Sequence, residues 1–322
     1  MTKLMRLFSL ILVATFISFM LIYLSPIDPV QQYVIGQGSI SAEQRLNIAE
    51  RWGLNEPPIK QYLNWLHQAI RGNFGTSIVY RQPVINVIME RAGNTFLLMF
   101  ISWMISGIIG YITGCLMAMK RNSMLDKLLK NICLILSSIP SYWVALLLLI
   151  IFSVKLAWFP IGFSSPIGST SDNVTFLQVL HHLFLPTITL IIFSFPSIAL
   201  HTRENLIGIL NSDYVLFSKA RGLTGWEIFK FHGVKSTLGA AFILQFMSFA
   251  ELFGGSVLVE TVFSYPGLGS TITTASIKSD APLILGITVF SILFVFLGNL
   301  LADILSQKLD PRVKSSSKKG IE

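Results

Sequence analysis

Six predominantly apolar runs divide the chain, and each is long enough to cross a bilayer as a helix. About 20 residues at helical rise span a hydrocarbon layer roughly 30 Å thick. The runs are continuous and do not alternate in hydropathy. This favours helices over a transmembrane barrel, because a helix satisfies its own backbone hydrogen bonds. The predicted spans are residues 7–24, 95–119, 132–154, 183–200, 238–263 and 283–305.

The first run raises the question of a secretory signal peptide, because Lys3 and Arg6 precede it. Its apolar core is longer than that of a signal peptide, and the following "YLSPIDP" has no small-x-small cleavage site. We therefore expect residues 1–24 to form a retained anchor that includes the first transmembrane helix.

Composition agrees with a membrane protein. Of the 322 residues, 52% are hydrophobic and only 12% are charged, and the mean hydropathy is +0.66. A soluble domain carries about 25% charged residues. The predicted fold class is an all-α integral membrane protein with six transmembrane helices.

The basic residues predict the orientation in the membrane. The net charge of +8 is typical either of nucleic-acid binding or of loops held on the cytoplasmic side of a bilayer. Most of the 24 Lys and Arg residues fall in short segments that would share the side of the N-terminus. We therefore expect a multi-pass protein with both termini cytoplasmic, and no nucleic-acid partner.

The loop after the first span, residues 25–94, has helical patterning and would lie outside the cell. Ser41 and Gln44 have the spacing of a capping box, and Gly53 follows the last turn of that amphipathic segment. A second amphipathic segment ends at Gly72. We expect a helical extracytoplasmic loop of about 70 residues, with a plain spacer as the alternative.

The stretch "NSDYVLFSKARGLTGWEIFKFHGVK", residues 211–235, reads like the surface of a soluble protein between two apolar runs. Ser212 and Asp213 are typical of a helix start, and Gly222 of a left-handed stop. Thr224 and Glu227 form a second capping-box pattern. The sequence predicts two short helices joined by a tight turn on the cytoplasmic side, between the fourth and fifth spans.

Short helices of this kind are marginal in water and need something to pack against. Two interpretations remain open: the aromatic side chains rest on the protein's own helices, or they enter a socket on a separate cytoplasmic protein. The predicted apolar surface comprises Tyr214, Val215, Phe217, Leu223 and Trp226, with Lys219 and Arg221 at its rim.

Seven motifs, in order, resemble the dipeptide, oligopeptide and nickel permeases of the ATP-binding-cassette (ABC) importers, specifically the first, B-type, of the two permeases. "DYVLFSKARGL", followed by His232, is similar to the coupling loop of that family. The likeness covers nearly the whole chain. The other motifs are "GLNEPPIKQYLNWLHQAIRGNFGTS", "RQPVINVIMERAGNTF", "SIPSYW", "HLFLPTITL", "VLVETVFSYPGLG" and "LADILSQKLDPR".

The resemblance implies a permease of the bacterial cytoplasmic membrane that forms half of a translocation pathway. Its implied partners are a second homologous permease, two cytoplasmic ABC ATPases, an extracytoplasmic solute-binding protein and membrane lipid. The family's substrates are short peptides, nickel chelates and related metal-binding small molecules, and the sequence does not choose among them. ATP and magnesium would bind the partner ATPases, and no cofactor is expected on this chain.

The resemblance also assigns residues to ATPase coupling. Gly222 matches the glycine of the family's loop, Ala220 its small residue, and Asp213, Tyr214 and Leu223 flanking positions; Arg221 lies between two of these. Three departures from the family's pattern concern side-chain detail, and one of them is that "GVKSTLGAA" lacks a proline that relatives often carry. Leu216, Phe217 and Ser218 stand where importers in general have Glu-Ala-Ala, and Lys235 stands where a proline would be.

Four further residues are candidates for the pathway or its gate. Glu251 lies near the middle of the predicted fifth span, where an ionised acid is costly unless it faces water or a partner. The alternative is a protonated or hydrogen-bonded glutamate that packs helices around Gly254 and Gly255. Glu260, Pro266 and Gly267 belong to the "VETVFSYPGLG" motif and would lie near the outer surface.

Other chemistry is not expected. The chain has no Gly-x-x-x-x-Gly-Lys-Ser/Thr motif, so it is not expected to be an enzyme that hydrolyses ATP. The two cysteines and five histidines lack disulfide or metal-ligand spacing, and no metal site is expected. Ser106, Gly110 and Gly114 form a small-residue stripe that predicts close helix packing.

The expected organisation and function follow from these observations. A stand-alone secondary transporter or channel is the alternative, and inverted repeats or several buried ionisable residues would favour it. The expected parts are residues 1–24, the anchor and first helix; 25–94, the outer loop; 95–305, a five-helix type-1 permease core with the coupling loop 201–237; and 306–322, a cytoplasmic tail.

Overall fold

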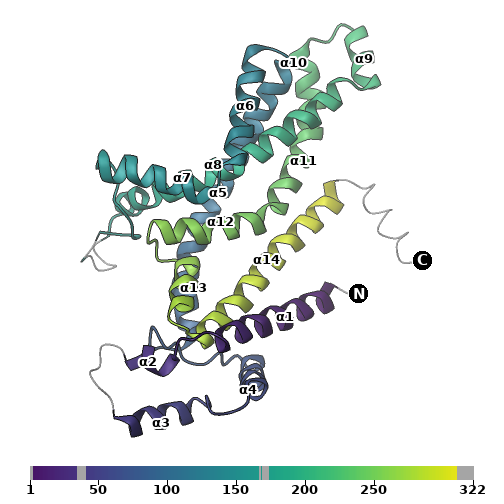
Figure 1. The fold of residues 1–322 in the computed structure, drawn as a ribbon. Helices are drawn as coiled ribbons and strands as arrows, with labels where there is room; N and C mark the ends of the chain where they lie inside the picture. The colour runs from purple at the N-terminus through teal and green to yellow at the C-terminus, as the bar shows by residue number, and fades with distance from the viewer. Residues whose placement is uncertain (1–2, 35–40, 167, 169–173, 310–322) are drawn as a thin grey trace. The chain divides into compact units, whose positions relative to one another are not determined.

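The computed structural model describes residues 3–34, 41–166, 168 and 174–309, and this part of the chain is helical (Figure 1). It divides into two compact units. Unit 1 comprises Met1–Phe96 and Pro266–Phe296, and unit 2 comprises Leu97–Tyr265 and Leu297–Glu322. The helices α5 (Val84–Met119) and α14 (Ala281–Leu309) contribute to both units.

Unit 1 contains the predicted outer loop, which is helical. Its core lies between the start of α5, α13 (Leu268–Ile277) and the start of α14, where Val84, Leu268 and Leu283 are fully or almost fully buried. Besides α5 and α14, the helices of unit 1 are α1 (Lys3–Tyr23), α2 (Pro29–Val34), α3 (Ala42–Arg51), α4 (Pro58–Ile70) and α13 (Leu268–Ile277).

The predicted signals in this loop are confirmed. Ser41 and Gln44 form a reciprocal capping box at the start of α3. Gly53 and Gly72 follow α3 and α4 with φ values of 67° and 85°, in the left-handed region that favours glycine. Tyr62 fastens α4 to α1, because its hydroxyl lies 2.9 Å from Thr15 Oγ1.

A buried carboxylate anchors the segment that leads into α5. Ser77 Oγ and the Val79 backbone N–H donate hydrogen bonds of 2.6 and 2.9 Å to Asp280 Oδ2, just before α14. Burial raises the pKa of the Asp280 carboxyl above its usual value, although these hydrogen bonds act in the opposite direction. No local pattern predicts a role for Asp280, because its partners lie about 200 positions away.

Unit 2 holds the other helices. The long helix α8 (Phe176–Leu210) contributes many of its buried residues. The remaining elements are α6 (Met124–Ser138), α7 (Ser141–Leu148), the π-helical turn η1 (Leu149–Lys155), α9 (Asp213–Ala220), α10 (Gly225–Ile228), the π-helical turn η3 (Phe229–Gly233), α11 (Val234–Met247) and α12 (Phe249–Val262).

Glycines allow α5 and α8 to approach closely. A β-carbon on Gly110 would lie 2.8 Å from Ile198 Cβ, and one on Gly114 would lie 2.5 Å from the carbonyl oxygen of Ala199. Such distances are too short for any residue with a β-carbon. The close packing predicted from the small-residue stripe is confirmed at these two positions.

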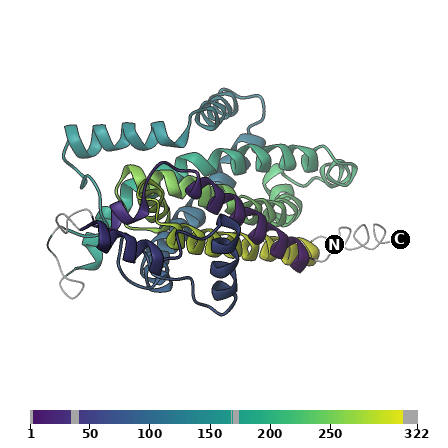
Figure 2. The same cartoon turned by 60° about the horizontal axis from the view of Figure 1, so that its bottom comes forward.

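Four of the six predicted spans are continuous helices, namely α1, α5, α8 and α14, and two are broken. The single helix predicted over 132–154 is wrong. The chain bends by 99° between α6 and the segment Ser141–Lys155, which comprises α7 and η1. The change of direction can be followed in Figure 1 and Figure 2. Pro140 causes the break, because proline lacks a backbone N–H and forces Ile139 into an extended conformation (ψ 128°).

The single helix predicted over 238–263 is also wrong, because the chain bends by 50° between α11 and α12. Ser248, at the bend, has φ −76° and ψ 1°, which interrupts the helical path. Helices α5 and α8 begin earlier than expected, at Val84 and Phe176. The described chain therefore has four to six candidate spans by length and composition.

Candidate functional site

Residues 211–222 form the first half of the predicted helix pair. Ser212 occupies the N-cap position of α9, as predicted, but its hydroxyl donates to the Ile209 carbonyl and does not cap the new helix. At the other end, Gly222 has φ 84°. The predicted left-handed stop is confirmed.

Two backbone hydrogen bonds close the turn at Gly222. The Gly222 N–H donates to the Lys219 carbonyl over 2.9 Å, and the Leu223 N–H donates to the Ser218 carbonyl over 3.2 Å. This is the pattern of a Schellman motif, which satisfies carbonyls left open by the last helical turn. The reversal of direction after α9 is therefore fixed by local contacts.

The second helix of the pair begins at the predicted cap, Thr224, but it is longer than predicted. Thr224 and Glu227 form the predicted capping box, with Thr224 N donating to Glu227 Oε2 over 2.8 Å. The helix that starts there does not end as a separate short element. It continues through η3 into α11, because no residue between Ile228 and Val234 leaves the helical region.

The apolar side chains of this segment separate onto two faces. Val215 and Ile228 are buried, at 0% and 1% exposure, whereas Phe217 and Trp226 are 65% and 62% exposed. Val215 therefore rests on the protein itself, in line with the first of the two interpretations, and is not part of the exposed apolar surface. The exposed apolar set, hereafter the aromatic surface, consists of Tyr214, Leu216, Phe217, Trp226 and Phe231.

Charged and polar groups border the aromatic surface. The Arg221 guanidinium lies 5.9 Å from the centroid of the Phe217 ring, within range of a cation–π contact. Asp213, Lys219 and Ala220 are exposed, and Leu223 is half-buried. The six predicted coupling residues therefore lie together on one short stretch of surface.

His232 holds the two halves of the segment together. Its Nε2 lies 3.3 Å from Ser218 Oγ, and its ring centroid lies 5.6 Å from that of Tyr214. From the sequence, His232 served only as part of the spacing of the family motif. No sequence pattern near His232 predicts its contact with Ser218, which lies 14 positions away.

A buried ion pair secures α8 ahead of this segment. Arg203 donates from Nε and Nη2 to the two carboxylate oxygens of Asp126, over 2.7 and 2.8 Å, and both residues are buried. Asp126 also accepts from the Asn122 backbone N–H. The pair fixes the start of α6 to α8 seven positions before α8 ends. The pair was not predicted from the sequence, because its members are 77 positions apart.

Glu251 does not lie inside an unbroken span. It occupies the first turn of α12, directly after the bend at Ser248, and its side chain is exposed. A helix N-terminus favours a carboxylate, because unpaired N–H groups and the helix dipole meet there. Of the two glycines suggested to pack helices, Gly255 lies against α8, since a β-carbon there would be 3.5 Å from Phe193 Cδ1, whereas one on Gly254 would meet no atom within 4 Å.

The other predicted gate residues fall in different units. Glu260, in the last turn of α12 in unit 2, is fully buried, and its carbonyl accepts from the Tyr265 N–H over 2.8 Å. Pro266 and Gly267 begin the second part of unit 1. The Pro266 carbonyl accepts from Asn94 Nδ2 over 2.8 Å, and Gly267 caps α13.

The adjacent histidines are used as anchors for a loop. His181 Nε2 lies 2.9 Å from the Trp158 carbonyl oxygen, and His182 Nδ1 lies 2.8 Å from that of Gly162. Among the described residues, no three His, Cys, Asp or Glu side chains gather as a metal site would require.

Comparisons with known proteins agree on one family. Residues 110–315 match the family described as "Binding-protein-dependent transport system inner membrane component". The chain is 34% identical to the oligopeptide transport system permease protein AppB of Bacillus subtilis (strain 168), over 93% of this chain and 94% of AppB. The chain belongs to this family. It is an ABC importer permease of the inner membrane, related to the B-type permeases.

Two further comparisons define the relationship. The permease is 31% identical to the metal-staphylopine import system permease protein CntB of Staphylococcus aureus, over 97% of this chain and 96% of CntB. Its fold is similar to a chain of the MetNI methionine ABC transporter in an inward-facing conformation. That match has a TM-score of 0.57 and 17% identity, and covers 70% of the permease and 97% of the MetNI chain.

Family membership shows in general terms which functions belong to this subunit and which belong to other subunits of the transporter. The permease is a membrane component, and components of this kind do not hydrolyse ATP. A binding-protein-dependent system also includes ATPase and binding-protein subunits. The seven sequence motifs therefore identified the family correctly.

Proposed function

We propose that the permease forms half of an import pathway for short peptides or for metal chelates of the staphylopine type. The relatives AppB and CntB are named for these two substrate classes. A second homologous permease supplies the other half of the pathway, and an extracytoplasmic solute-binding protein delivers the substrate. Both termini lie in the cytoplasm, as the distribution of Lys and Arg favours.

The aromatic surface is the proposed docking site for a cytoplasmic ATPase. It is the observation that carries the coupling proposal, because large aromatic side chains exposed to this degree are enriched in protein interfaces. Phe217 and Trp226 stand on backbone that is fixed by the turn at Gly222 and the cap at Thr224. The surface therefore has a defined shape before any partner binds.

Closure of the ATPases on ATP would move the aromatic surface and the helices joined to it. Helix α8 leads into α9 with one short turn, and α10 runs through η3 into α11 without a break. A movement of residues 213–223 would therefore be transmitted directly to α8 on one side and to α11 on the other. Asp213, Tyr214, Ala220, Arg221, Gly222 and Leu223 are the proposed coupling residues.

The bend at Ser248 is the proposed position where motion reaches the pathway. Glu251 follows the bend and is the proposed pathway residue, and its exposed carboxylate would suit a cationic group on the substrate. Glu260, Pro266 and Gly267 are the proposed outer gate. These assignments rest on position and on the family motif.

A matched pair of tryptophans tests the docking proposal. Trp226 in the aromatic surface and Trp158 elsewhere in unit 2 are 62% and 61% exposed. In the assembled transporter, we expect Trp226→Ser to lower the amount of ATPase that copurifies by about tenfold, the cost of removing a central interface aromatic. Trp158→Ser should leave it unchanged.

Two results would contradict the proposal. One is equal copurification of the ATPase with the Phe217→Ser/Trp226→Ser double variant and the native permease. The other is proton-driven uptake by the isolated chain, as a stand-alone secondary transporter would show. A cysteine introduced at Lys219 tests the orientation, because a membrane-impermeant thiol reagent should reach it only from the cytoplasmic side.

A further inference from the structure

Four basic residues, hereafter the basic cluster, surround the turn between α5 and α6 in unit 2. Lys120 and Arg121 directly follow α5, and Lys127 and Lys130 belong to α6. All four residues are exposed. We propose that the basic cluster binds the phosphate of an anionic phospholipid, whose acyl chains lie along the apolar side chains of α5 and α6.

The turn that carries the cluster is held by local contacts. Asn122 has φ 65°, and the Ser123 N–H donates to the Lys120 carbonyl over 3.1 Å. Ser123 caps α6, because its hydroxyl accepts from the Asp126 N–H over 3.3 Å. The Asp126 carboxylate in turn accepts from the Asn122 N–H over 2.9 Å. The backbone of the turn is therefore ordered before any ligand binds.

The acidic side chains at this corner are already paired. Asp126 and Glu204 both accept hydrogen bonds from the Arg203 guanidinium. In the part of the chain that the structure describes, no carboxylate forms an ion pair with any member of the basic cluster. These cations therefore remain available to an external anion, and phosphate is a strong acceptor for Lys and Arg.

The two lysines of α6 stand on a helix that is fixed in place. Residues three apart on a helix are neighbours, so Lys127 and Lys130 lie on the same side of α6. Cys133 is buried together with Met117 of α5 and Ala199 of α8, and this packing holds α6 against both helices. The basic cluster therefore combines a fixed turn with a fixed helix.

Exposed apolar side chains lie next to the basic cluster. On α5, Ile108, Ile112 and Leu116 recur at every fourth residue and are each about half exposed. On α6, Leu128 and Ile135 are 61% and 60% exposed. A phospholipid joins a charged headgroup to apolar chains, whereas a soluble phosphate compound has no chains to cover these residues. The combination favours a lipid.

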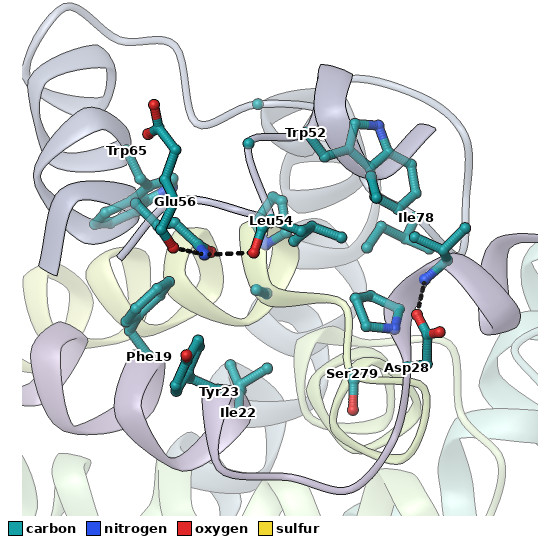
Figure 3. Close-up of a pocket in the computed structure, with 18 of the residues that line it drawn as sticks. Phe19, Ile22, Tyr23, Asp28, Trp52, Leu54, Glu56, Trp65, Ile78 and Ser279 are labelled. Carbon is teal, nitrogen blue, oxygen red and sulfur yellow. Dashed lines mark hydrogen bonds between the residues drawn. The ribbon is translucent and has the colours of Figure 1, made fainter. Parts of the chain in front are cut away.

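The large pocket of unit 1 is different, because its polar groups are satisfied within the chain (Figure 3). Gln61 Nε2 donates to the carbonyls of Leu54 and Glu56. Arg45 pairs with Asp28 in the same pocket. Groups that are already paired do not select a ligand. The members of the basic cluster have no such partners among the described residues.

The inner leaflet of the membrane is the proposed source of the lipid. This placement rests on the proposed function, which puts the α5–α6 turn on the cytoplasmic side. Basic clusters immediately cytoplasmic of a transmembrane helix attract anionic lipids. The exposed apolar side chains between residues 104 and 138 that precede Tyr142 are aliphatic or Met, with no aromatic ring among them. They therefore suit acyl chains better than a protein interface, where aromatic residues are enriched.

Native mass spectrometry of the full-length permease in detergent tests the inference, because bound lipids are counted by mass. The probe is dioleoyl phosphatidylglycerol, and dioleoyl phosphatidylcholine has the same chains without the net charge. Each basic residue near an anionic lipid contributes on the order of fivefold in affinity. We expect phosphatidylglycerol to bind about tenfold more tightly or better. Equal affinity for the two lipids would overturn the proposal.

Matched double variants locate the site. Lys127→Gln/Lys130→Gln removes two charges from the basic cluster, whereas Lys155→Gln/Lys278→Gln removes two exposed lysines that lie elsewhere. We expect the first to weaken phosphatidylglycerol binding by about tenfold or more and the second to leave it unchanged. Lys127→Arg/Lys130→Arg keeps the charge and should retain native affinity. Equal affinity of the two glutamine variants would refute the site.

Two further measurements separate a lipid from other anions. Glycerophosphoglycerol is the headgroup without chains, and an equimolar amount should not displace phosphatidylglycerol. Full displacement would indicate a site for soluble phosphate compounds and would overturn the lipid proposal. Loss of copurifying ATPase from the Lys127→Gln/Lys130→Gln variant, with unchanged phosphatidylglycerol binding, would overturn it as well and assign the surface to the ATPase.

The outcome can be separated from that of the proposed function, because lipid binding is measured without other subunits. If the two lipids bind equally while Trp226→Ser still releases the ATPase, the lipid inference fails and the importer proposal stands. If phosphatidylglycerol binds with the expected variant pattern while no ATPase copurifies with the native permease, the importer proposal fails and the lipid site stands.

Discussion

The indole N–H of Trp103 donates a 2.9 Å hydrogen bond to the main-chain carbonyl of Gln245, and so links α5 to the last turn of α11. The same carbonyl accepts from Ser248 Oγ over 3.0 Å. Carbonyls in the last turn of a helix lack intrahelical partners. The indole therefore satisfies a group beside the bend between α11 and α12 and holds that bend against α5.

Removal of this donor should loosen the bend. We expect Trp103→Phe, which keeps an aromatic ring, to lower the free energy of unfolding by about 1 kcal/mol, the usual worth of an interhelical hydrogen bond. Thermal unfolding of the detergent-solubilised permease measures the effect. Trp143→Phe is the control, because Trp143 is largely exposed. Equal stability of the two variants would contradict the assignment.

The Asp126–Arg203 pair should be much more sensitive than a surface pair. Asp126→Ala removes the buried charge partner of the Arg203 guanidinium and leaves it only the exposed Glu204, which should cost about 3–5 kcal/mol. Lys60→Ala removes a partner from the exposed Lys60–Glu56 pair and should cost less than about 1 kcal/mol. The yield and thermal stability of folded permease distinguish the two. Asp126→Ala at native stability would contradict the prediction.

Gly222 and Gly225 have equal space around them but different backbone conformations. A β-carbon on either residue would meet no atom within 4 Å, but only Gly222 has a positive φ. A β-branched residue is strained in that conformation, so we expect Gly222→Val to insert in the membrane yet abolish substrate-stimulated ATPase activity of the assembled transporter.

The matched variants make this result specific. Gly225→Val should keep most of the ATPase stimulation, and Gly222→Asn should retain more than Gly222→Val because asparagine tolerates the left-handed region. Unchanged stimulation in Gly222→Val would count against a coupling role for this turn.

Gly114 and Gly208 form a similar pair in the packed helices. A β-carbon on Gly114 would lie 2.5 Å from the Ala199 carbonyl oxygen, whereas one on Gly208 would meet nothing within 4 Å. We expect Gly114→Ala to destabilise the permease by about 1–3 kcal/mol through overpacking. Gly208→Ala should stabilise it by up to about 1 kcal/mol through helix propensity. Thermal unfolding provides both values, and destabilisation of equal size would refute the packing argument.

Local signals in the sequence predicted local structure well. The capping boxes at Ser41 and Thr224 and the left-handed glycines at 53, 72 and 222 depend on residues within four positions of each other. Hydropathy located all six apolar segments but not their breaks. Pro140 was visible in the sequence as a breaker, whereas Ser248 carries no comparable signal, because serine occurs both within helices and at their ends.

Long-range contacts were not predictable from one sequence. Asp126 and Arg203 are 77 positions apart, and neither has neighbours that indicate a partner. The burial of Val215 shows a related limit. In a helix of eight residues, apolar side chains occur on nearly every face, so periodicity cannot distinguish the inner face from the outer. Packing against the rest of unit 2 decides it.

The turn at Gly222 has a consequence for the thermodynamics of assembly. Its backbone hydrogen bonds and the adjacent Thr224–Glu227 cap are all made within the permease itself. The segment would therefore lose little conformational entropy if another protein bound Phe217 and Trp226. The binding free energy would be more favourable by the ordering cost that is avoided. An isolated peptide of the same sequence would lack this preorganisation and should bind far more weakly than the intact permease.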